Sequence, residues 1–155
     1  MVSNNNRQKD GQKTNKENKG KKKSLFQLIQ DMTVSDKIKL AMKGDKEART
    51  ILIQDGNRMV QLAVLDNPRI TESEIVNISR SRNVDDEVLR RIANSREWSK
   101  LYQVRVSLVN NPKTPVAVAM RFVSMLMTSD LKSLAASKSV PSAVSTAAKR
   151  IISRK

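Results

Sequence analysis

The chain lacks the residue types on which most enzyme sites depend. Its 155 residues include no cysteine and no histidine, and only 3% of them are aromatic. Without cysteine there is neither a disulfide nor a thiolate, and without histidine no side chain has an ordinary pKa near neutrality. These absences exclude Ser-His and Cys-His catalysis and the usual zinc sites. We therefore expect a protein that is not an enzyme and has no metal or cofactor.

Long apolar runs are also absent. No stretch approaches the roughly 20 apolar residues that span a bilayer, and the first residues are polar, unlike the apolar centre of a signal peptide. A cytoplasmic protein is the expectation. A core with so few aromatic side chains must be built from aliphatic residues and methionine, a composition that favours helices.

Positive charge is abundant, and it lies at the two ends of the chain. The formal net charge is +15, divided into +6 for residues 1–24, zero for residues 25–99 and +9 for residues 100–155. Asp130 is the only acidic residue in the last of these segments. The asymmetry favours an anionic partner that is contacted by the N-terminal tail and the C-terminal third.

The composition changes at about residue 25. Residues 1–24 are rich in Asn, Gln and Lys and contain almost no aliphatic side chain, so they bury too little apolar surface to offset their ordering entropy. This segment is expected to be a disordered Lys-rich tail. Residues 25–155 alternate short apolar clusters with turn residues, which predicts one domain of short helices.

Local chemistry predicts several helix ends. Ser35 is expected to begin a helix that stops at Gly44, and Asp45 to begin the next one. Thr71 has Glu74 three residues after it, which is the spacing of a capping box.

Two segments with Asn-Pro punctuation lie 44 residues apart, at Asn67-Pro68 and at Asn111-Pro112. In the second segment we expect the proline to end one helix, Thr114 to cap the next helix, and Pro115 to occupy its first position. A weaker copy occurs at Val140-Pro141. Repeated punctuation of this kind predicts a repeated helical unit.

The pattern Leu-Ala-x-x-x-Asn-Pro-x-x-Thr resembles the HEAT-like and leucine-rich-repeat-variant helical repeats, over roughly residues 35–153. The residues that carry the resemblance are Leu62-Ala63, Asn67-Pro68 and Thr71 in one copy, and Leu108, Asn111-Pro112 and Thr114-Pro115 in the other. The resemblance implies an all-α fold, a short α-solenoid of about eight short helices in HEAT-like stacked pairs. It also implies a surface that binds proteins or, less often, nucleic acid.

The unbalanced cations are the candidate anion-binding residues. Lysine suits phosphate contacts because it releases counterions without requiring rigid geometry. Two alternatives stay open: the tail merely keeps the protein soluble, and the C-terminal cations stabilise the last helix through its dipole. The candidates are Lys19, Lys21, Lys22, Lys23, Arg121, Lys132, Lys138, Lys149, Arg150 and Arg154.

The only Trp and the only Tyr form a second candidate site. Trp98 and Tyr102 are expected on one face of a helix over residues 98–110, with Arg96 and Arg105 nearby. The pair either anchors a protein partner or packs between helix layers.

A group of arginines between residues 80 and 105 has two interpretations. They either line the concave surface and bind carboxylate or phosphate, or pair with the interleaved acids Asp85, Asp86, Glu87 and Glu97, which is favoured. The group comprises Arg80, Arg82, Arg90, Arg91, Arg96 and Arg105.

Three methionines, Met120, Met125 and Met127, fall in the most apolar predicted helix, over residues 115–127. Because methionine fills irregular gaps, we expect them to be core residues; the alternative is an adaptable Met-rich groove.

Two functions follow from these features. The leading expectation is a non-enzymatic helical-repeat adaptor that engages an anionic macromolecule, nucleic acid or a ribonucleoprotein, through its tail and C-terminal third. The alternative is a protein–protein scaffold that holds an acidic partner segment in the solenoid groove.

Overall fold

The computed structural model describes residues 23–154, and these residues are all-helical, as expected. They contain eleven helices and no strand, whereas about eight helices were expected. The predicted disordered tail lies almost entirely outside the described residues. The chain divides into two compact units, Met1–Met32 and Thr33–Lys155. The expected domain boundary at residues 24–25 stays a prediction.

In the first unit the structure describes one helix, α2 (Leu25–Gln30). Ser24 begins it with a complete capping box, because the Gln27 N–H donates to the Ser24 hydroxyl and the Ser24 N–H donates to the Gln27 side chain. Lys23, one of the candidate phosphate ligands, is exposed and pairs with Asp31 at 2.7 Å.

The second unit contains ten helices in its described residues, each of 4 to 12 residues. Helices this short are not stable alone in water, so their stability comes from packing. They are α3 (Val34–Lys43), α4 (Lys46–Leu52), α5 (Arg58–Leu65), α6 (Glu72–Arg80), α7 (Asp86–Asn94), α8 (Arg96–Ser99), α9 (Tyr102–Asn110), α10 (Val116–Val123), α11 (Thr128–Ala136) and α12 (Ser142–Ser153).

Most of the predicted caps are confirmed. Gly44 ends α3, Asp45 begins α4, and Thr71 forms its capping box with Glu74 at the start of α6. Ser35 is not a cap, because the hydroxyl of Thr33 accepts the first free N–H and the helix begins two residues earlier.

Gly44 is required by the close approach of α3 and α4. A Cβ atom at this position would lie 2.7 Å from the Leu40 carbonyl oxygen and 2.8 Å from the Ala48 Cβ atom. Both distances are shorter than side chains tolerate, so only glycine allows the turn between these helices to be this tight.

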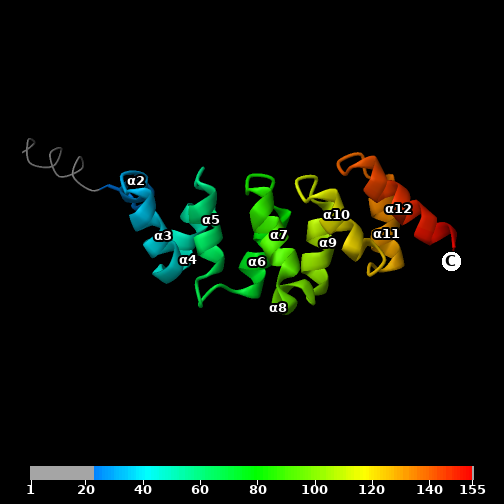
Figure 1. Cartoon of the computed structure of the whole chain (residues 1–155), viewed down its shortest axis with the longest axis horizontal. Coiled ribbons are helices and arrows are strands. Elements are labelled where there is room, and N and C mark those ends of the chain that lie inside the picture. Colours follow the sequence, from blue (N-terminus) through cyan, green and yellow to red (C-terminus); the bar gives the residue numbers. More distant parts are fainter. Residues whose placement is uncertain (1–22, 155) are drawn as a thin grey trace, which may run out of the picture. The chain divides into compact units, whose positions relative to one another are not determined.

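One unit of structure recurs four times: a helix, a five-residue loop and a second helix. The hairpin loops span 53–57, 81–85, 111–115 and 137–141, and the N-caps that end them are 28, 30 and 26 residues apart. The structural period is therefore shorter than the 44-residue spacing of the Asn-Pro pairs. In Figure 1 these loops lie along the upper edge of the second unit, and the links between hairpins lie along the lower edge.

Packing in the second unit joins helices that are close in sequence. The first helices of adjacent hairpins pack together, as α6 does on α9, and so do second helices, as α5 does on α7 and α10 on α12. The interior is aliphatic, with Phe122 as its only buried aromatic side chain among the described residues. Each hairpin thus buries its apolar face against its neighbours.

The asparagines of the two Asn-Pro pairs both bind backbone carbonyls at the end of another helix. They do so although Asn67 follows the second helix of a hairpin and Asn111 follows the first. Asn67 follows α5, and its amide nitrogen donates to the carbonyls of Ala41 (3.0 Å) and Gly44 (2.9 Å) at the end of α3. Asn111 follows α9, and its amide nitrogen donates to the carbonyls of Ser79 (2.9 Å) and Ser81 (2.8 Å) at the end of α6. Each asparagine therefore binds the C-terminus of the helix against which its own preceding helix packs, where carbonyls have no partner within the helix.

The predicted capping role of Thr114 is wrong. Pro115 itself occupies the N-cap position of α10, and the Thr114 side chain is only 3% exposed, with a hydroxyl oxygen that has no hydrogen-bond partner. Val84 and Val140 occupy the same position in two other hairpin loops and are also buried. Thr114 is thus a core position filled by a polar residue.

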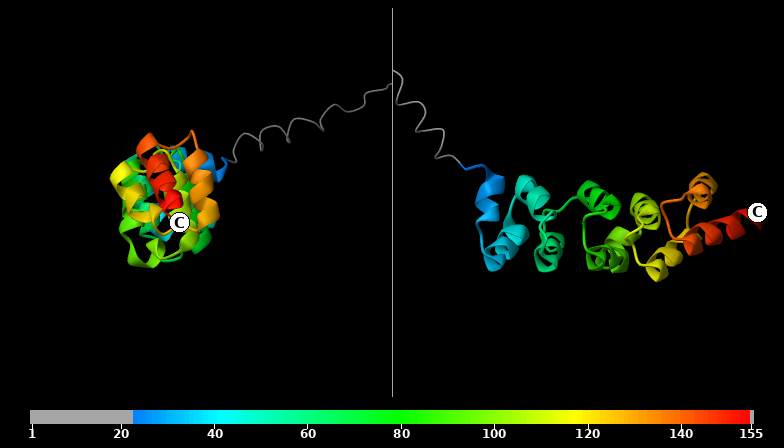
Figure 2. Two further views of the ribbon diagram at one scale, coloured as in Figure 1. Left: turned by 90° about the vertical axis from the view of Figure 1, so that its right-hand side faces the viewer. Right: turned by 90° about the horizontal axis from the view of Figure 1, so that it is seen from above.

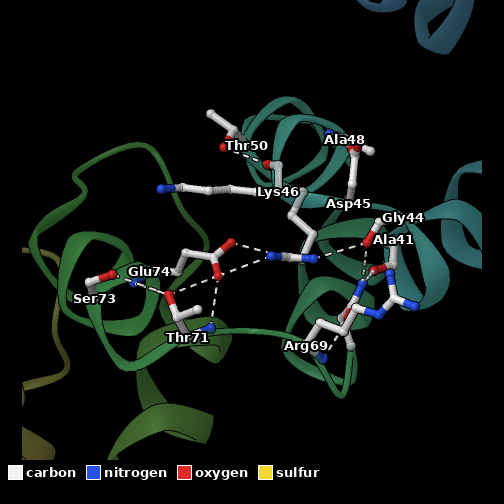
Figure 3. Close-up of polar contacts among 12 residues, drawn as sticks. Ala41, Gly44, Asp45, Lys46, Ala48, Thr50, Arg69, Thr71, Ser73 and Glu74 are labelled. Carbon is white, nitrogen blue, oxygen red and sulfur yellow. Dashed lines mark hydrogen bonds and ion pairs between the residues drawn. The ribbon is translucent and has the colours of Figure 1, made fainter.

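A buried ion pair connects three helices at the N-terminal end of the second unit. Arg49 on α4 binds the Glu74 carboxylate through two nitrogens, at 2.8 and 3.2 Å, and donates to the Gly44 carbonyl at 3.0 Å. Glu74 also accepts from the N–H and the hydroxyl of Thr71 (Figure 3). Burial alone raises the pKa of Glu74, but the hydrogen bonds from Arg49 and Thr71 outweigh it and lower the pKa below its ordinary value.

The single helix expected over residues 98–110 is two helices. α8 ends at Ser99, Leu101 is extended, and α9 begins at Tyr102, so Trp98 and Tyr102 do not share one helical face. Ser95 caps α8 immediately after α7, and the Arg105 guanidinium binds the Ser99 carbonyl at 2.7 Å. These two local contacts stabilise a separate short helix, which apolar periodicity does not reveal.

The core role predicted for the methionines is also wrong. Met120, Met125 and Met127 are 41%, 49% and 62% exposed. The interior positions of α10 are occupied by Phe122, Val123 and smaller residues, and α10 ends at Val123, which leaves two methionines in the link to α11.

Candidate nucleic-acid interface

The C-terminal hairpin carries an open groove lined by three lysines. α11 and α12 pack side by side, and both views in Figure 2 show them together at the C-terminal end of the second unit. Lys132 lies on α11, Lys138 in the loop and Lys149 on α12. We call this surface the basic groove; its lining residues are Lys132, Ala135, Ala136, Ser137, Lys138, Ser145, Lys149 and Ile152.

The packing of the two helices places these lysines at the edge of their interface. Leu131 on α11 and Ala148 on α12 are fully buried. Each is followed by a lysine, and a step of one residue turns a side chain by about 100° around the helix axis. Lys132 and Lys149 therefore emerge from the interface into solvent, and both are exposed.

No acidic side chain balances the groove. From Leu131 to the end of the chain there are six Lys or Arg residues and no Asp or Glu. Within the described part of the chain, none of the groove lysines takes part in an ion pair. The acid that precedes the groove, Asp130, accepts a hydrogen bond from the Tyr102 hydroxyl. Burial and this hydrogen bond raise the pKa of Tyr102, so the phenol stays protonated and remains a donor.

The remaining anion-binding candidates do not line the groove. Arg150 and Arg154 are exposed at the end of α12. Arg121 on α10 donates to the Asn94 side chain at 2.8 Å and lies 5.3 Å from the centroid of the Phe122 ring, so its guanidinium links α10 to the end of α7. Lys19, Lys21 and Lys22 lie outside the described residues.

The candidate protein-binding residues are partly engaged within the chain. Tyr102 is half-buried, and its hydroxyl accepts from the Met127 N–H at 2.9 Å while donating to Asp130. Trp98 is half-buried on α8, Arg96 is exposed at the start of α8, and Arg105 uses its guanidinium on the backbone of Ser99.

Ion pairing is confirmed for two of the arginines in residues 80–105. Arg90 pairs with Glu87 at 3.3 Å, and Arg91 pairs with Asp66 of the preceding hairpin. Two others, Arg80 and Arg82, which the sequence offered as possible carboxylate or phosphate ligands, line a second groove between α6 and α9. Its lining residues are Arg80, Arg82, Val106, Ser107, Asn110 and Asn111. Asp85, Asp86 and Glu87 follow Arg82 closely in the sequence, which favoured ion pairs, and only packing brings α9 beside the two arginines.

Two kinds of site are absent from the residues that the structure describes. No group of three or more Asp or Glu side chains is placed to hold a metal ion. None of the helices between residues 23 and 154 has the length and apolar character needed to cross a membrane.

Comparison with known proteins gave no relative. No family model matches the chain, and no curated protein or solved structure matches it.

Proposed function

We propose that the protein is a non-enzymatic α-solenoid, resembling the HEAT-like repeats, that binds an anionic macromolecule. The solenoid is supported by the recurrence of the hairpin at 26 to 30 residues and by packing between neighbouring hairpins. In such proteins each repeat is stabilised mainly by its neighbours, and the stack provides an extended surface for a partner.

The proposed partner is nucleic acid or a ribonucleoprotein, and the proposed contact is the basic groove. The observation that carries this proposal is the convergence of Lys132, Lys138 and Lys149 on one surface, in a segment with no acidic residue. Lysines that meet phosphates release counterions and position a protein without reading bases, so binding is independent of sequence and falls steeply with salt. The lysines of the N-terminal tail add to the same attraction.

The alternative, a scaffold centred on Trp98 and Tyr102 for an acidic partner, has less support. The Tyr102 hydroxyl, one of the polar groups of the aromatic pair, is already shared between Asp130 and the Met127 N–H. Tyr102 therefore acts within the chain, where it connects α9 to the start of α11.

The proposal is tested by measuring the affinity of the full chain for a labelled single-stranded oligonucleotide across a salt series, using fluorescence anisotropy. Replacing the three groove lysines with glutamine should reduce the slope of log affinity against log salt by about 2, since each contact with a single strand contributes about 0.7.

A matched control changes the same charge elsewhere in the second unit. Lys39, Lys43 and Lys46 are exposed on α3 and α4, and none of them forms an ion pair among the described residues. Their triple glutamine variant should keep nearly the full slope. Absence of binding by the unmodified chain, or equal losses in the two triple variants, would contradict the proposal.

A further inference from the structure

The hairpin loops of the second unit are connected to one another by buried side-chain amides. Gln61 donates to the Asp55 carbonyl at 2.7 Å in loop 53–57 and accepts from the Asp85 N–H at 2.8 Å in loop 81–85. Asn111, in loop 111–115, donates to the Ser81 carbonyl at 2.8 Å. These bonds fix the positions of three consecutive loops relative to one another along the upper edge in Figure 1. Loop 137–141 follows on the same edge.

Three of these loops each present one exposed cation at the second or third position: Arg82, Lys113 and Lys138. Within the described residues none of the three side chains forms an ion pair. Arg82 lines the groove between α6 and α9, and Lys138 lines the basic groove. The charged side chains thus extend from the C-terminal groove along the loop edge toward the middle of the unit.

The acids on this edge lie at its N-terminal part: Asp55 in loop 53–57, and Asp85 with Asp86 and Glu87 at the start of α7. Asp55 pairs with Lys37 at 2.8 Å, and Asp85 caps α7 by accepting the Glu87 N–H at 2.9 Å. The hydrogen bond from the Glu87 N–H, and further the charges of Arg58 and Lys113, lower the pKa of Asp85, so this carboxylate offsets part of the charge of Lys113. Loops 111–115 and 137–141, the last two of the row, contain no acidic residue.

The spacing of the cations favours a linear ligand. Packed helices lie about 8–10 Å apart, so cations on successive loops form a row along the stack instead of a cluster around one point. A row of single charges matches the repeated phosphates of a polymer better than one small anion, which would need several donors converging on it.

Aromatic side chains are missing from this edge in the described residues. Trp98 lies on α8, which Figure 1 shows at the opposite, lower edge of the unit, and Phe122 is buried. Without an aromatic surface, bases have nothing to stack on, so contacts on the loop edge involve the phosphate backbone.

We propose, building on the nucleic-acid function above, that Arg82, Lys113 and Lys138 form a cationic row that binds the phosphodiester backbone of one nucleic-acid strand as it leaves the basic groove. The strand follows the hairpin loops, with Lys138 belonging to both surfaces. Binding along the row is independent of base sequence.

The test uses a variant that leaves the basic groove intact, Arg82→Gln with Lys113→Gln in the full chain. Its matched control is Arg69→Gln with Lys100→Gln, which removes the same two charge types from exposed positions in the links on the opposite edge. The probe is a labelled oligothymidylate of about 30 nucleotides, long enough to pass from the groove onto the loops. Affinity is measured against salt, and circular dichroism melting checks that both variants fold.

The loop variant should lower the salt slope by about 1.4, from two contacts of about 0.7 each, and the control should leave it nearly unchanged. Equal slopes for the two double variants, with normal binding by the unmodified chain, would overturn the row while leaving the basic groove in place. Failure of the unmodified chain to bind the oligonucleotide would overturn both proposals. A polyglutamate peptide that binds as tightly, with the same loss in the loop variant, would overturn the assignment to nucleic acid.

Discussion

Replacing Asn111 with alanine should strongly destabilise the protein, because it removes a buried amide that forms several hydrogen bonds. The Asn111 side chain is 4% exposed and takes part in three hydrogen bonds: to the carbonyls of Ser79 and Ser81, and from the Lys113 N–H at 2.9 Å. At about 1 kcal/mol for each bond, the expected loss in the free energy of unfolding is about 3 kcal/mol. The Tm should fall by roughly 10 °C.

Asn67→Ala should have a similar effect, because the Asn67 side chain forms the same three kinds of hydrogen bond. It is 2% exposed, donates to two carbonyls and accepts from the Arg69 N–H at 2.9 Å. Two substitutions 44 residues apart should therefore give nearly equal losses, measured by urea unfolding followed by far-UV circular dichroism.

The neighbouring Asn110 provides the control. It is half-buried, and its amide donates only to the Val106 carbonyl within its own helix, at 2.9 Å. Asn110→Ala should cost no more than about 0.5 kcal/mol. Asn111→Asp should cost more than Asn111→Ala, because a carboxylate cannot donate and would face two carbonyl oxygens. Equal stability of the Asn110 and Asn111 alanine variants would refute the assigned role of the buried amide.

Two further expectations concern buried polar groups. Thr114→Val should raise the free energy of unfolding by about 1 kcal/mol, because it replaces a buried hydroxyl without a partner by a methyl group; a destabilised variant in urea unfolding would show that the hydroxyl is satisfied. The lowered pKa of Glu74 means that its contribution to stability is complete above its ordinary pKa of 4.5 and is lost as the pH falls through the lower, folded-state value. Glu74→Gln should therefore flatten the decline in Tm below that pH, and an unchanged pH profile would show that the Arg49 ion pair does not contribute to it.

Many helix boundaries were predictable because they depend on residues close together in the chain. Thr71 and Glu74 form a capping box wherever their backbone begins a helix, and Gly44 and Asp45 mark an end and a start by their own chemistry. Ser35 and Thr114 show the limit of this reasoning. At Ser35 the hydroxyl of Thr33, two residues earlier, is the cap, and at Thr114 the next residue, Pro115, holds the N-cap position without a side-chain bond.

The candidate site was predictable in part. The excess of cations after residue 99 is a property of composition, so Lys132, Lys138 and Lys149 were identifiable as candidates. Their convergence on one groove required the α11–α12 packing. Arg121 has the same charge, but packing directs it to the end of α7, away from the groove.

The sequence by itself determined the helical class, most of the caps and the uneven charge, because each of these depends on composition or on contacts within a few residues. Only the tertiary structure decided what Asn67 and Asn111 bind, why the methionines of α10 and its link are exposed, and which cations lie together. Those outcomes depend on packing between residues far apart in the sequence; the two asparagine amides, for example, bind carbonyls 23 to 32 residues away along the chain.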